Sequence, residues 1–348
     1  MILVATLLVA SATPPEPIIH DLAFTGPNGW TYDARLLEPA GKRSGLTVLM
    51  IGGGIGNDLD WTVPGTLEWN GSSTQMTIDG TTHHDAPRIA RSLTAHGHAV
   101  MHYSTIAHED PKRDGWPFEI TLMTPADLLL LAQAAARVTS ERPETRTDHL
   151  VLLAHSMGAQ RACAQAAEDP HVKALVLIGA AQMTRTGPDD PGRNLQRTSA
   201  AERLGALDLD QDGLVQGEEI PDTLDFDGDG ILRAWELSAS MAMKARDSIQ
   251  GKLPDKNGMP FGEDSLQTRP LPTLVLYGNL DEAQAYHAPV LQSLATSGVL
   301  PNLKVRILPG IGHQLGPEQD GRLGPISDTA LNATATFINA QIINTVDD

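Results

Sequence analysis

Hydrophobic positions along the chain follow two alternating spacings, one typical of strands and the other typical of helices. Near the start, β-branched and aromatic residues alternate with polar ones over 22–24 and 30–37, which predicts antiparallel strands. A continuous apolar run at 46–51 ends in glycines, as in a strand that is buried on both faces. Further strands are predicted at 99–103, 150–154, 174–178, 273–277 and 305–308, and helices at 86–95, 125–138, 157–167, 288–296 and 328–343.

This order of strands and helices predicts the α/β class. Strands joined by helical crossovers lie parallel in one sheet, and the helices cover its two faces. One long stretch breaks the order, because residues 184–262 contain no strand-like run and differ in composition. Structureless loops of that length are rare in compact domains, which indicates an inserted module. We therefore expect a core in two parts, 13–183 and 263–348, around this insertion.

Residues 1–12 have the features of a secretory signal peptide. Residues 2–10 are an uncharged apolar run, and an Ala-Ser-Ala triplet at 10–12 provides a cleavage site. The run is too short to cross a bilayer, and no other stretch approaches the length of a membrane helix. The alternative is a buried first strand. With a signal peptide the protein is secreted or periplasmic, and its single cysteine, Cys163, leaves it without an intrachain disulfide.

The charge of the chain excludes one class of function. The net charge is −18 at pH 7, and aromatic residues make up only 4% of the sequence. A polyanion repels phosphate backbones, and few aromatic side chains are available to stack on bases, so we expect no binding of DNA or RNA. Residues 202–236 hold eleven acidic and two basic residues, a net −9 that is half of the total.

Ser156 lies where a predicted buried strand turns into a predicted helix. The surrounding sequence, Ala-His-Ser-Met-Gly at 154–158, has small residues two positions to either side of the serine. Such a tight strand-to-helix turn strains the backbone and exposes the hydroxyl group, which is the arrangement of a nucleophilic serine. A serine that only caps the helix is the alternative. The strand before Ser156 and the helix after it favour the nucleophile.

An acid and a base for this serine follow the late strands. Asp281 comes just after the strand at 273–277, and we prefer it to its neighbour Glu282. His313 lies in a glycine-flanked loop after the last strand. In a serine triad the acid orients the histidine, which accepts the serine proton. The alternatives are that Asp281 forms a turn and that His313 is a surface histidine.

Acyl transfer also requires donors for the developing oxyanion. The first is expected to be the backbone N–H of Met157, directly after the nucleophile. The second is expected in the glycine-rich loop that follows the strand at 46–51, at Gly54 or alternatively at Ile55. A glycine-rich loop can also hold phosphate. The Rossmann and P-loop spacings are absent here, however, and no Lys-Ser/Thr pair follows.

Together these residues resemble the α/β-hydrolase superfamily. Residues 53–60, Gly-Gly-Ile-Gly-Asn-Asp-Leu-Asp, look like the G-S-G-x-x-D-x-D loop of bacterial esterases and serine-peptidase-like hydrolases. The resemblance covers 18–183 and 263–348. It implies a mostly parallel eight-stranded sheet flanked by helices, a Ser-Asp-His triad and cleavage of esters or amides. It also implies that an insertion after the sixth strand covers the nucleophile as a cap or lid. One departure is that residues 104–109 replace the D-x-R-G-x-G loop common in such enzymes.

Two segments of the insertion match the twelve-residue EF-hand loop, at 208–219 and 225–236. Alternating carboxylates surround one point with hard oxygen ligands, a glycine makes the turn, and the last glutamate can bind bidentately. The two loops therefore predict two Ca²⁺ sites, with a solvated acidic stretch as the alternative. Only residues 220–224 separate them, too few for the usual helices. The predicted ligand positions are Asp208, Asp210, Asp212, Leu214, Gln216 and Glu219 in the first loop and Asp225, Asp227, Asp229, Ile231, Arg233 and Glu236 in the second.

The sequence therefore predicts a secreted serine hydrolase that acts on small-molecule carboxylic esters and carries a calcium-stabilised cap. A peptidase or a thioesterase would use the same acyl chemistry. A function of another class is also open, in which a hydrolase-like scaffold binds a protein partner or a surface through its calcium module. An intact set of serine, acid and histidine favours the enzyme.

Overall fold

The computed structural model describes residues 15–54, 57–63, 66–69, 74–77, 82–110, 123–145, 149–185, 200, 202–221, 223–246, 259–319 and 322–345. The predicted signal peptide at 1–12 and the alternative oxyanion donor Ile55 lie outside the described residues. Among the described residues, no helix combines the length and the apolar composition that crossing a bilayer requires.

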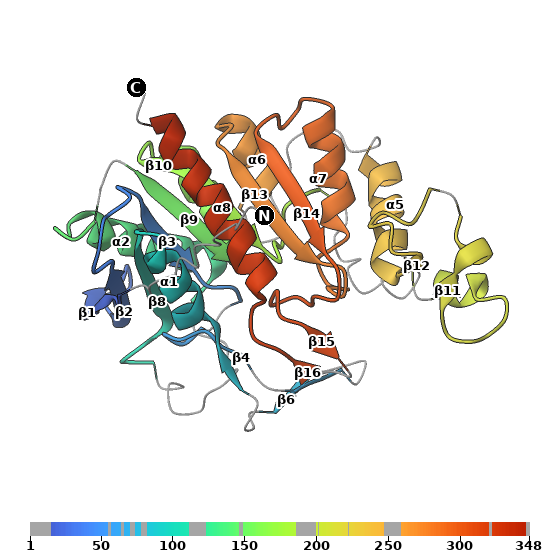
Figure 1. The fold of residues 1–348 in the computed structure, drawn as a ribbon, viewed down its shortest axis with the longest axis horizontal. Helices are drawn as coiled ribbons and strands as arrows, with labels where there is room; N and C mark the ends of the chain where they lie inside the picture. Colours follow the sequence, from blue (N-terminus) through green and yellow to red (C-terminus); the bar gives the residue numbers. More distant parts are fainter. Residues whose placement is uncertain are drawn as a thin grey trace, which may run out of the picture.

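An eight-stranded sheet forms the centre of the molecule (Figure 1). Its strands, in spatial order, are β1 (Ile18–Thr25), β2 (Thr31–Glu38), β8 (Ala99–Ala107), β3 (Thr47–Ile51), β9 (Leu150–His155), β10 (Val172–Ile178), β13 (Thr273–Gly278) and β14 (Leu303–Leu308). The pairs β1–β2 and β2–β8 are antiparallel, and the pairs from β8 to β14 are parallel. The predicted mostly parallel sheet is confirmed.

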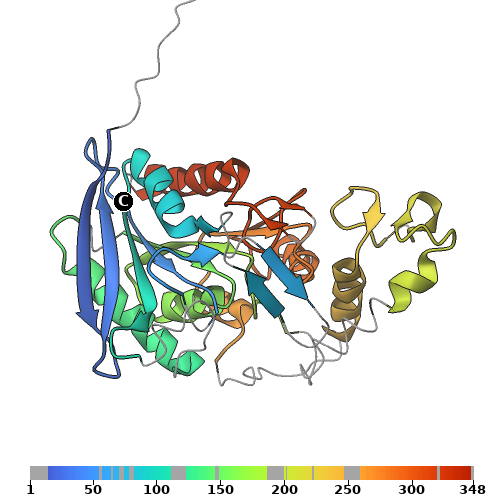
Figure 2. The ribbon, with the colours of Figure 1, turned by 90° about the horizontal axis from the view of Figure 1, so that it is seen from below.

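Helices cover both faces of this sheet, and Figure 2 shows the layers from the side. One core cluster joins α1 (Asp85–Ala95) and α8 (Asp328–Thr345) to one face. The other joins α2 (Pro125–Ser140), α3 (Gly158–Glu168) and α7 (His287–Thr296) to the opposite face. Every side chain of β3 is buried because successive residues point into the two clusters. This burial explains the unbroken apolar run in the sequence.

β8 continues beyond its predicted end at residue 103 and reaches Ala107. The added residues include Ser104 and Thr105, which are polar but buried. They are satisfied by the loop after β3, because Thr105 N–H donates to the Asn57 carbonyl at 2.9 Å and Asn57 N–H donates to the Thr105 hydroxyl at 2.7 Å. Hydrophobic spacing misses this extension because tertiary hydrogen bonds replace apolar contacts there.

Small sheets that the sequence did not predict join two loops of the core. A four-stranded sheet contains β5 (Thr66–Trp69), β6 (Thr74–Thr77), β15 (Glu318–Gln319) and β16 (Arg322–Leu323), and a two-stranded one pairs β4 (Thr62–Val63) with β7 (His83–His84). β16 pairs with β5, so the segment after β14 is tied to the segment after β3. Strands this short have too few residues to show a period.

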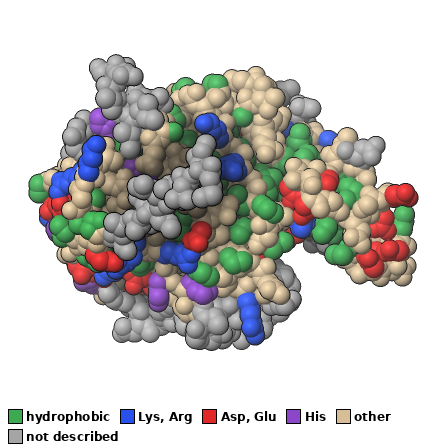
Figure 3. All heavy atoms as spheres, in the orientation of Figure 1, with side chains coloured by type: hydrophobic (Ala, Val, Ile, Leu, Met, Phe, Trp, Pro, Cys, Tyr) green, Lys and Arg blue, Asp and Glu red, His purple; other side chains and the backbone are tan. Residues whose placement is uncertain are grey.

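The insertion follows β10, the sixth strand of the central sheet along the chain. It contains β11 (Val215–Gln216), the short helix η3 (Gly217–Glu219), β12 (Ile231–Leu232) and α5 (Ala234–Arg246), and α6 (Gly262–Thr268) leads back into β13. β11 and β12 project to one side of the core in Figures 1 and 2. The acidic side chains seen on that side in Figure 3 belong to this projecting lobe.

The expectation that 184–262 contains no strand is wrong, because β11 and β12 pair antiparallel. The pairing places Val215 opposite Leu232, and both side chains are buried in a separate small core with Ala200 and Leu237. The two acidic loops therefore pair through their eighth positions even though few residues separate them. Each strand has only two residues and depends on the other loop, so neither gives a signal in the sequence.

Candidate active site and acidic loops

The turn at Ser156 has the geometry that the sequence predicts. Ser156 has a φ of +52°, in the left-handed region that non-glycine residues rarely occupy. α3 starts two residues later and packs against the end of β3. A Cβ atom at Gly158 would lie 2.6 Å from the carbonyl oxygens of Ile51 and Gly52. Only glycine fits this approach, which holds the serine at the carboxyl end of the sheet.

Ser156, His313 and Asp281 lie together although they are far apart in the sequence. Each follows the carboxyl end of a parallel strand: β9, β14 and β13 respectively. The Ser156 hydroxyl oxygen is 3.1 Å from His313 Nε2, and His313 Nδ1 is 2.8 Å from Asp281 Oδ2. The Asp281 side chain is fully buried. This chain of hydrogen bonds can carry the serine proton onto the imidazole.

Backbone groups fix the carboxylate of Asp281. Its Oδ1 accepts hydrogen bonds from the N–H groups of Ala283, at 3.1 Å, and Gln284, at 3.0 Å. The neighbouring Glu282 instead accepts a hydrogen bond from the backbone of Trp235 in α5, at 3.2 Å. The two adjacent acids therefore serve different partners: Asp281 contacts the histidine, and Glu282 contacts the insertion.

The glycine-rich loop lies directly beside the nucleophile. A Cβ atom at Gly53 would come within 2.7 Å of the Ser156 Cβ atom, so the loop backbone can approach the serine this closely only because Gly53 has no side chain. Gly54 has a φ of +58°, and Met157, the residue directly before α3, has a helical backbone conformation. The predicted donors Met157 and Gly54 thus belong to segments on either side of the serine.

Arg161 of α3 holds this loop, a role that the sequence motifs did not predict. Arg161 is a residue of α3 and is buried, with 1% of its surface exposed. The guanidinium group donates to the carbonyl oxygens of Gly52, at 2.5 Å, and Gly54, at 3.3 Å. Burial lowers the pKa of Arg161 to about 10, which leaves it charged at neutral pH. An arginine within the run of small residues that opens this helix was the available signal.

A second residue that the sequence did not point to, His155, packs against His313. The ring centroids of His155 and His313 are 4.9 Å apart, and His155 Nε2 lies 3.3 Å from the backbone carbonyl of His313. Burial, followed by the nearby His313, lowers the pKa of His155 to about 3. His155 is therefore neutral at neutral pH and adds no charge that would oppose an imidazolium at His313.

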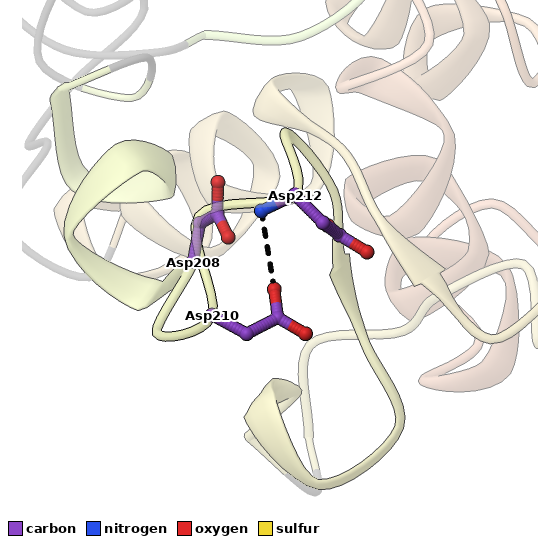
Figure 4. A group of neighbouring side chains, drawn as sticks. All are labelled: Asp208, Asp210 and Asp212. Carbon is purple, nitrogen blue, oxygen red and sulfur yellow. Dashed lines mark hydrogen bonds between the residues drawn. The ribbon is translucent and has the colours of Figure 1, made fainter.

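The acidic loops of the insertion gather carboxylates in two groups. Oxygens of Asp208, Asp210 and Asp212 lie within 4.8 Å of one another, and Figure 4 shows these side chains together with the Asp212–Asp210 hydrogen bond. Those of Asp225, Asp227 and Asp229 form the second group with the same spread. Each group occupies positions 1, 3 and 5 of its loop, the positions that bind Ca²⁺ in an EF-hand.

The remaining predicted ligand positions surround these groups. Glu219 accepts hydrogen bonds from Leu209 and Gln216 of its own loop, at 2.7 and 3.2 Å. Glu236 is fully buried and accepts from Phe226 and Arg233, at 2.7 and 2.8 Å. The side-chain amide of Gln216 donates to Asp212, and the carbonyl group of Ile231 accepts from Arg233. The carboxylate of Glu236 thus reaches its own loop from α5.

The second group contains a buried carboxylate oxygen that accepts no hydrogen bond from the described residues. This atom is Oδ2 of Asp227, whose side chain is 6% exposed. In the first group, Asp208 Oδ1 is also buried and likewise has no donor in the described part of the chain. Buried carboxylate oxygens are costly unless a cation or a donor meets them. Oxygen-only groups of this kind fit a hard divalent cation.

Arg233 acts as a cation within the second loop. Its guanidinium nitrogen Nη1 lies 2.7 Å from Asp229 Oδ2 and 3.7 Å from Asp227 Oδ2. A guanidinium group has no lone pair for a metal ion, so the Arg233 side chain can only compete with a cation for these carboxylates. The Leu214 and Ile231 positions would contribute backbone carbonyl groups.

Helix α5 of the insertion contacts the loop after β13 that contains Asp281. Trp235 of α5 is buried, and its indole N–H donates to the carbonyl oxygen of Asn279 at 3.0 Å. α5 also packs on α7. The segments 186–199 and 247–258, which complete the predicted cap, lie outside the described residues.

No protein-family model matches this chain, and no curated protein sequence does either. Solved structures do match it over nearly its whole length. A putative dienelactone hydrolase from Klebsiella pneumoniae subsp. pneumoniae MGH 78578 is 11% identical, with 94% of this chain and 99% of that chain covered and a TM-score of 0.53. An esterase from Pyrococcus furiosus is 10% identical, with 93% and 91% covered and a TM-score of 0.52. Together with the order of the sheet, they show that the chain has the α/β-hydrolase fold.

Asp281→Asn should lower kcat by a factor on the order of 10⁴, because the asparagine amide would favour the wrong tautomer of His313. The measurement is turnover of a short aryl ester at saturating concentration. Glu282→Gln is the matched control and should stay near the wild-type rate, because the glutamine side-chain oxygen can still accept the hydrogen bond from the Trp235 backbone. The reverse ranking of the two variants would move the acid by one position.

Arg161→Met should lower kcat about 10²-fold and change KM little, because the oxyanion loop loses the donors that hold its carbonyl groups. The methionine keeps most of the buried apolar volume. Gln165→Met, a buried amide in the same helix, is the control for a general loss of packing. Equal kcat values for the two variants, after correction for the folded fraction, would contradict the positioning role of Arg161.

Proposed function

We propose that this protein is a secreted serine hydrolase that cleaves carboxylic esters of small molecules through an acyl-enzyme intermediate on Ser156. The observation that carries the proposal is the hydrogen-bonded chain from the Ser156 hydroxyl through His313 to the buried Asp281. A helix-capping serine needs neither a histidine nor a buried acid behind it. The left-handed turn at Ser156 supports the same role, because such strain is typical of functional residues.

In this mechanism the hydroxyl group of Ser156 attacks the ester carbonyl carbon while His313 Nε2 takes its proton. Asp281 keeps the Nδ1 proton in place and stabilises the imidazolium that forms. The N–H of Met157 and one from the loop at Gly54 or Ile55 donate to the oxyanion. His313 then protonates the leaving alcohol, and water releases the acyl group by the same steps in reverse.

Esters are the preferred substrates because the matched folds include an esterase and a putative dienelactone hydrolase. An amide or a thioester would undergo the same acyl transfer at Ser156, and a substrate panel separates these possibilities. The insertion would act as a cap, since it follows the sixth strand and its α5 contacts the acid loop.

Two calcium ions complete the proposal, one held by 208–219 and one by 225–236. The groups of carboxylates and the buried oxygens of Asp208 and Asp227 support this assignment. Bound there, Ca²⁺ would neutralise clustered negative charge and take no part in the acyl chemistry. Sites of this kind in extracellular modules bind with a Kd of roughly 10⁻⁴ to 10⁻³ M, which suits an exported protein.

A fluorophosphonate probe should label the wild-type protein at Ser156, and Ser156→Ala should abolish labelling and lower ester turnover by about 10⁶. Mass spectrometry of the labelled peptide identifies the residue. Ser140→Ala, on the distant helix α2, should behave like the wild type. A panel of ester, thioester and amide substrates then ranks the acyl donors. Wild-type turnover by Ser156→Ala would reject the mechanism.

Calcium should bind with a heat measurable by calorimetry at millimolar concentration and raise the melting temperature by roughly 2–5 °C, because binding only to the folded state adds stability. Glu219→Gln and Glu236→Gln should each weaken the response by removing a charged ligand. Glu218→Gln, one residue before a ligand position, should not. A protein with no binding heat and no change in melting temperature would lack the proposed calcium sites.

A further inference from the structure

We propose that Asn279 is a positioning residue through which the second acidic loop, 225–236, controls the proton relay between Asp281 and His313. This inference rests on the proposed function, because it concerns the regulation of that site by calcium. Neither the sequence motifs nor the fold assigns a role to Asn279. Asn279 makes four hydrogen bonds, two through its backbone and two through its side chain.

Asn279 lies at the point where four parts of the chain meet. It directly follows β13, lies two residues before Asp281, and is 2% exposed. Its backbone N–H donates to the carbonyl oxygen of Leu308 at the end of β14, at 3.0 Å. Its backbone carbonyl accepts from the indole N–H of Trp235 in α5, at 3.0 Å. Asn279 is therefore fixed between the last two strands and the insertion.

The side-chain amide of Asn279 joins the histidine loop to the second acidic loop. Its Oδ1 accepts a hydrogen bond from Gly310 N–H at 2.7 Å, three residues before His313. Its Nδ2 donates to Asp229 Oδ2 at 3.0 Å. Because the amide is planar, a change in the position of Asp229 turns or shifts the group that Gly310 contacts. A side chain that only filled space would not link these two loops.

The loop after β13, which contains Asp281, and the loop after β14, which contains His313, are also joined directly. Leu280 N–H donates to the carbonyl oxygen of Ile311 at 2.9 Å, so these loops move as one unit. Asp281 follows Leu280, and His313 lies two residues after Ile311. A displacement at Asn279 therefore reaches both ends of the hydrogen bond between Asp281 and His313, whose length decides how well the imidazolium is stabilised.

Asp229 Oδ2 has a second partner, which makes its position dependent on cations. Arg233 Nη1 lies 2.7 Å from the same oxygen that accepts from Asn279. The second acidic loop cannot hold a divalent cation among Asp225, Asp227 and Asp229 and keep Arg233 at this position. Cation binding therefore changes the surroundings of the oxygen that Asn279 contacts, and the two sites are coupled.

A bound cation would hold Asp229 together with the other carboxylates of the loop, so the Asn279 amide would gain a more rigid acceptor. We expect calcium to raise kcat about tenfold, within the 5- to 150-fold range of typical coupling between sites. Without the cation, Arg233 keeps Asp229 near Asn279, and a slower turnover remains. The effect should be equal for short and long esters, because the proton relay is common to both.

The test uses two aspartate variants of the full-length protein. Asn279→Asp keeps an oxygen that can accept from Gly310 N–H but removes the donor to Asp229. It should reduce the tenfold ratio of kcat with calcium to kcat with chelator to nearly one. Asn302→Asp is the matched control, because the side-chain amide of Asn302 donates to the carbonyl oxygen of Pro270 at the opposite end of β14. It should keep the wild-type ratio.

A second measurement does not depend on turnover. Phenylboronic acid forms a tetrahedral adduct with a nucleophilic serine, and its affinity can be measured with calcium and with chelator. Calcium should tighten its binding several-fold, and the boronic acid should tighten calcium binding by the same factor, since coupling is reciprocal. Both shifts should disappear in Asn279→Asp. Melting curves of each variant show that it is folded.

The outcomes separate this inference from the proposed function. If Ser156 is labelled and calcium binds, but Asn279→Asp keeps the wild-type ratio, the role of Asn279 is refuted and the hydrolase stands. A calcium effect confined to the KM of long esters would refute it in favour of a lid. A protein that hydrolyses esters but binds no calcium would also refute it. If esters are not hydrolysed and Ser156 is not labelled, both proposals fall.

Discussion

The left-handed backbone at Ser156 is held from both sides, and the rest of the site depends on it. Ser156 N–H donates to the carbonyl oxygen of Ile178 in β10 at 2.9 Å, and the Ser156 carbonyl accepts from Ala181 at 3.1 Å. On the other side, the missing side chains at Gly53 and Gly158 let the loop after β3 and the start of α3 approach closely. The strain at φ +52° persists because the neighbouring strands over-determine the turn.

Two arginine side chains hold oxygen atoms of the loops around the candidate site. Arg161 is buried beneath the loop after β3 and holds two carbonyl groups. Arg233 lies on the carboxylates of the second acidic loop, where it offsets part of the negative charge. The first is permanent because it is enclosed in the core. The second is replaceable because a divalent cation would take the same oxygens.

Much of the fold and of the candidate site could be predicted because both depend on local patterns. Apolar runs mark the buried parallel strands, and Ser156, Asp281 and His313 each follow such a run at the same edge of the sheet. The sequence favoured Asp281 over Glu282 only because Asp281 is the first acidic residue after β13. In the structure, Asp281 is the one hydrogen-bonded to His313. Pairing of Val215 with Leu232 was not predicted, because β11 and β12 have only two residues each and depend on the other loop.

Residues that act through distant partners could not be predicted in the same way. Asn279 and Arg161 have roles only because β13 meets the insertion and α3 meets the loop after β3, contacts that span 50 to more than 100 positions. The end of β8 was missed for the same reason, since Asn57 rather than an apolar neighbour satisfies Thr105. Sequence spacing reports which face of an element is buried, but it does not report which polar groups meet across elements.

The two halves of the candidate site are therefore supported by different parts of the molecule. The serine and the oxyanion loop are held by β3, β9 and α3, which belong to the core and contain Arg161. The acid and histidine loops are instead in contact with α5 and the second acidic loop through Trp235 and Asn279. A change in the insertion would act mainly on proton transfer and leave oxyanion stabilisation almost unaltered. In the proposed enzyme, this division would let the inserted module adjust the rate without rebuilding the strained turn at Ser156.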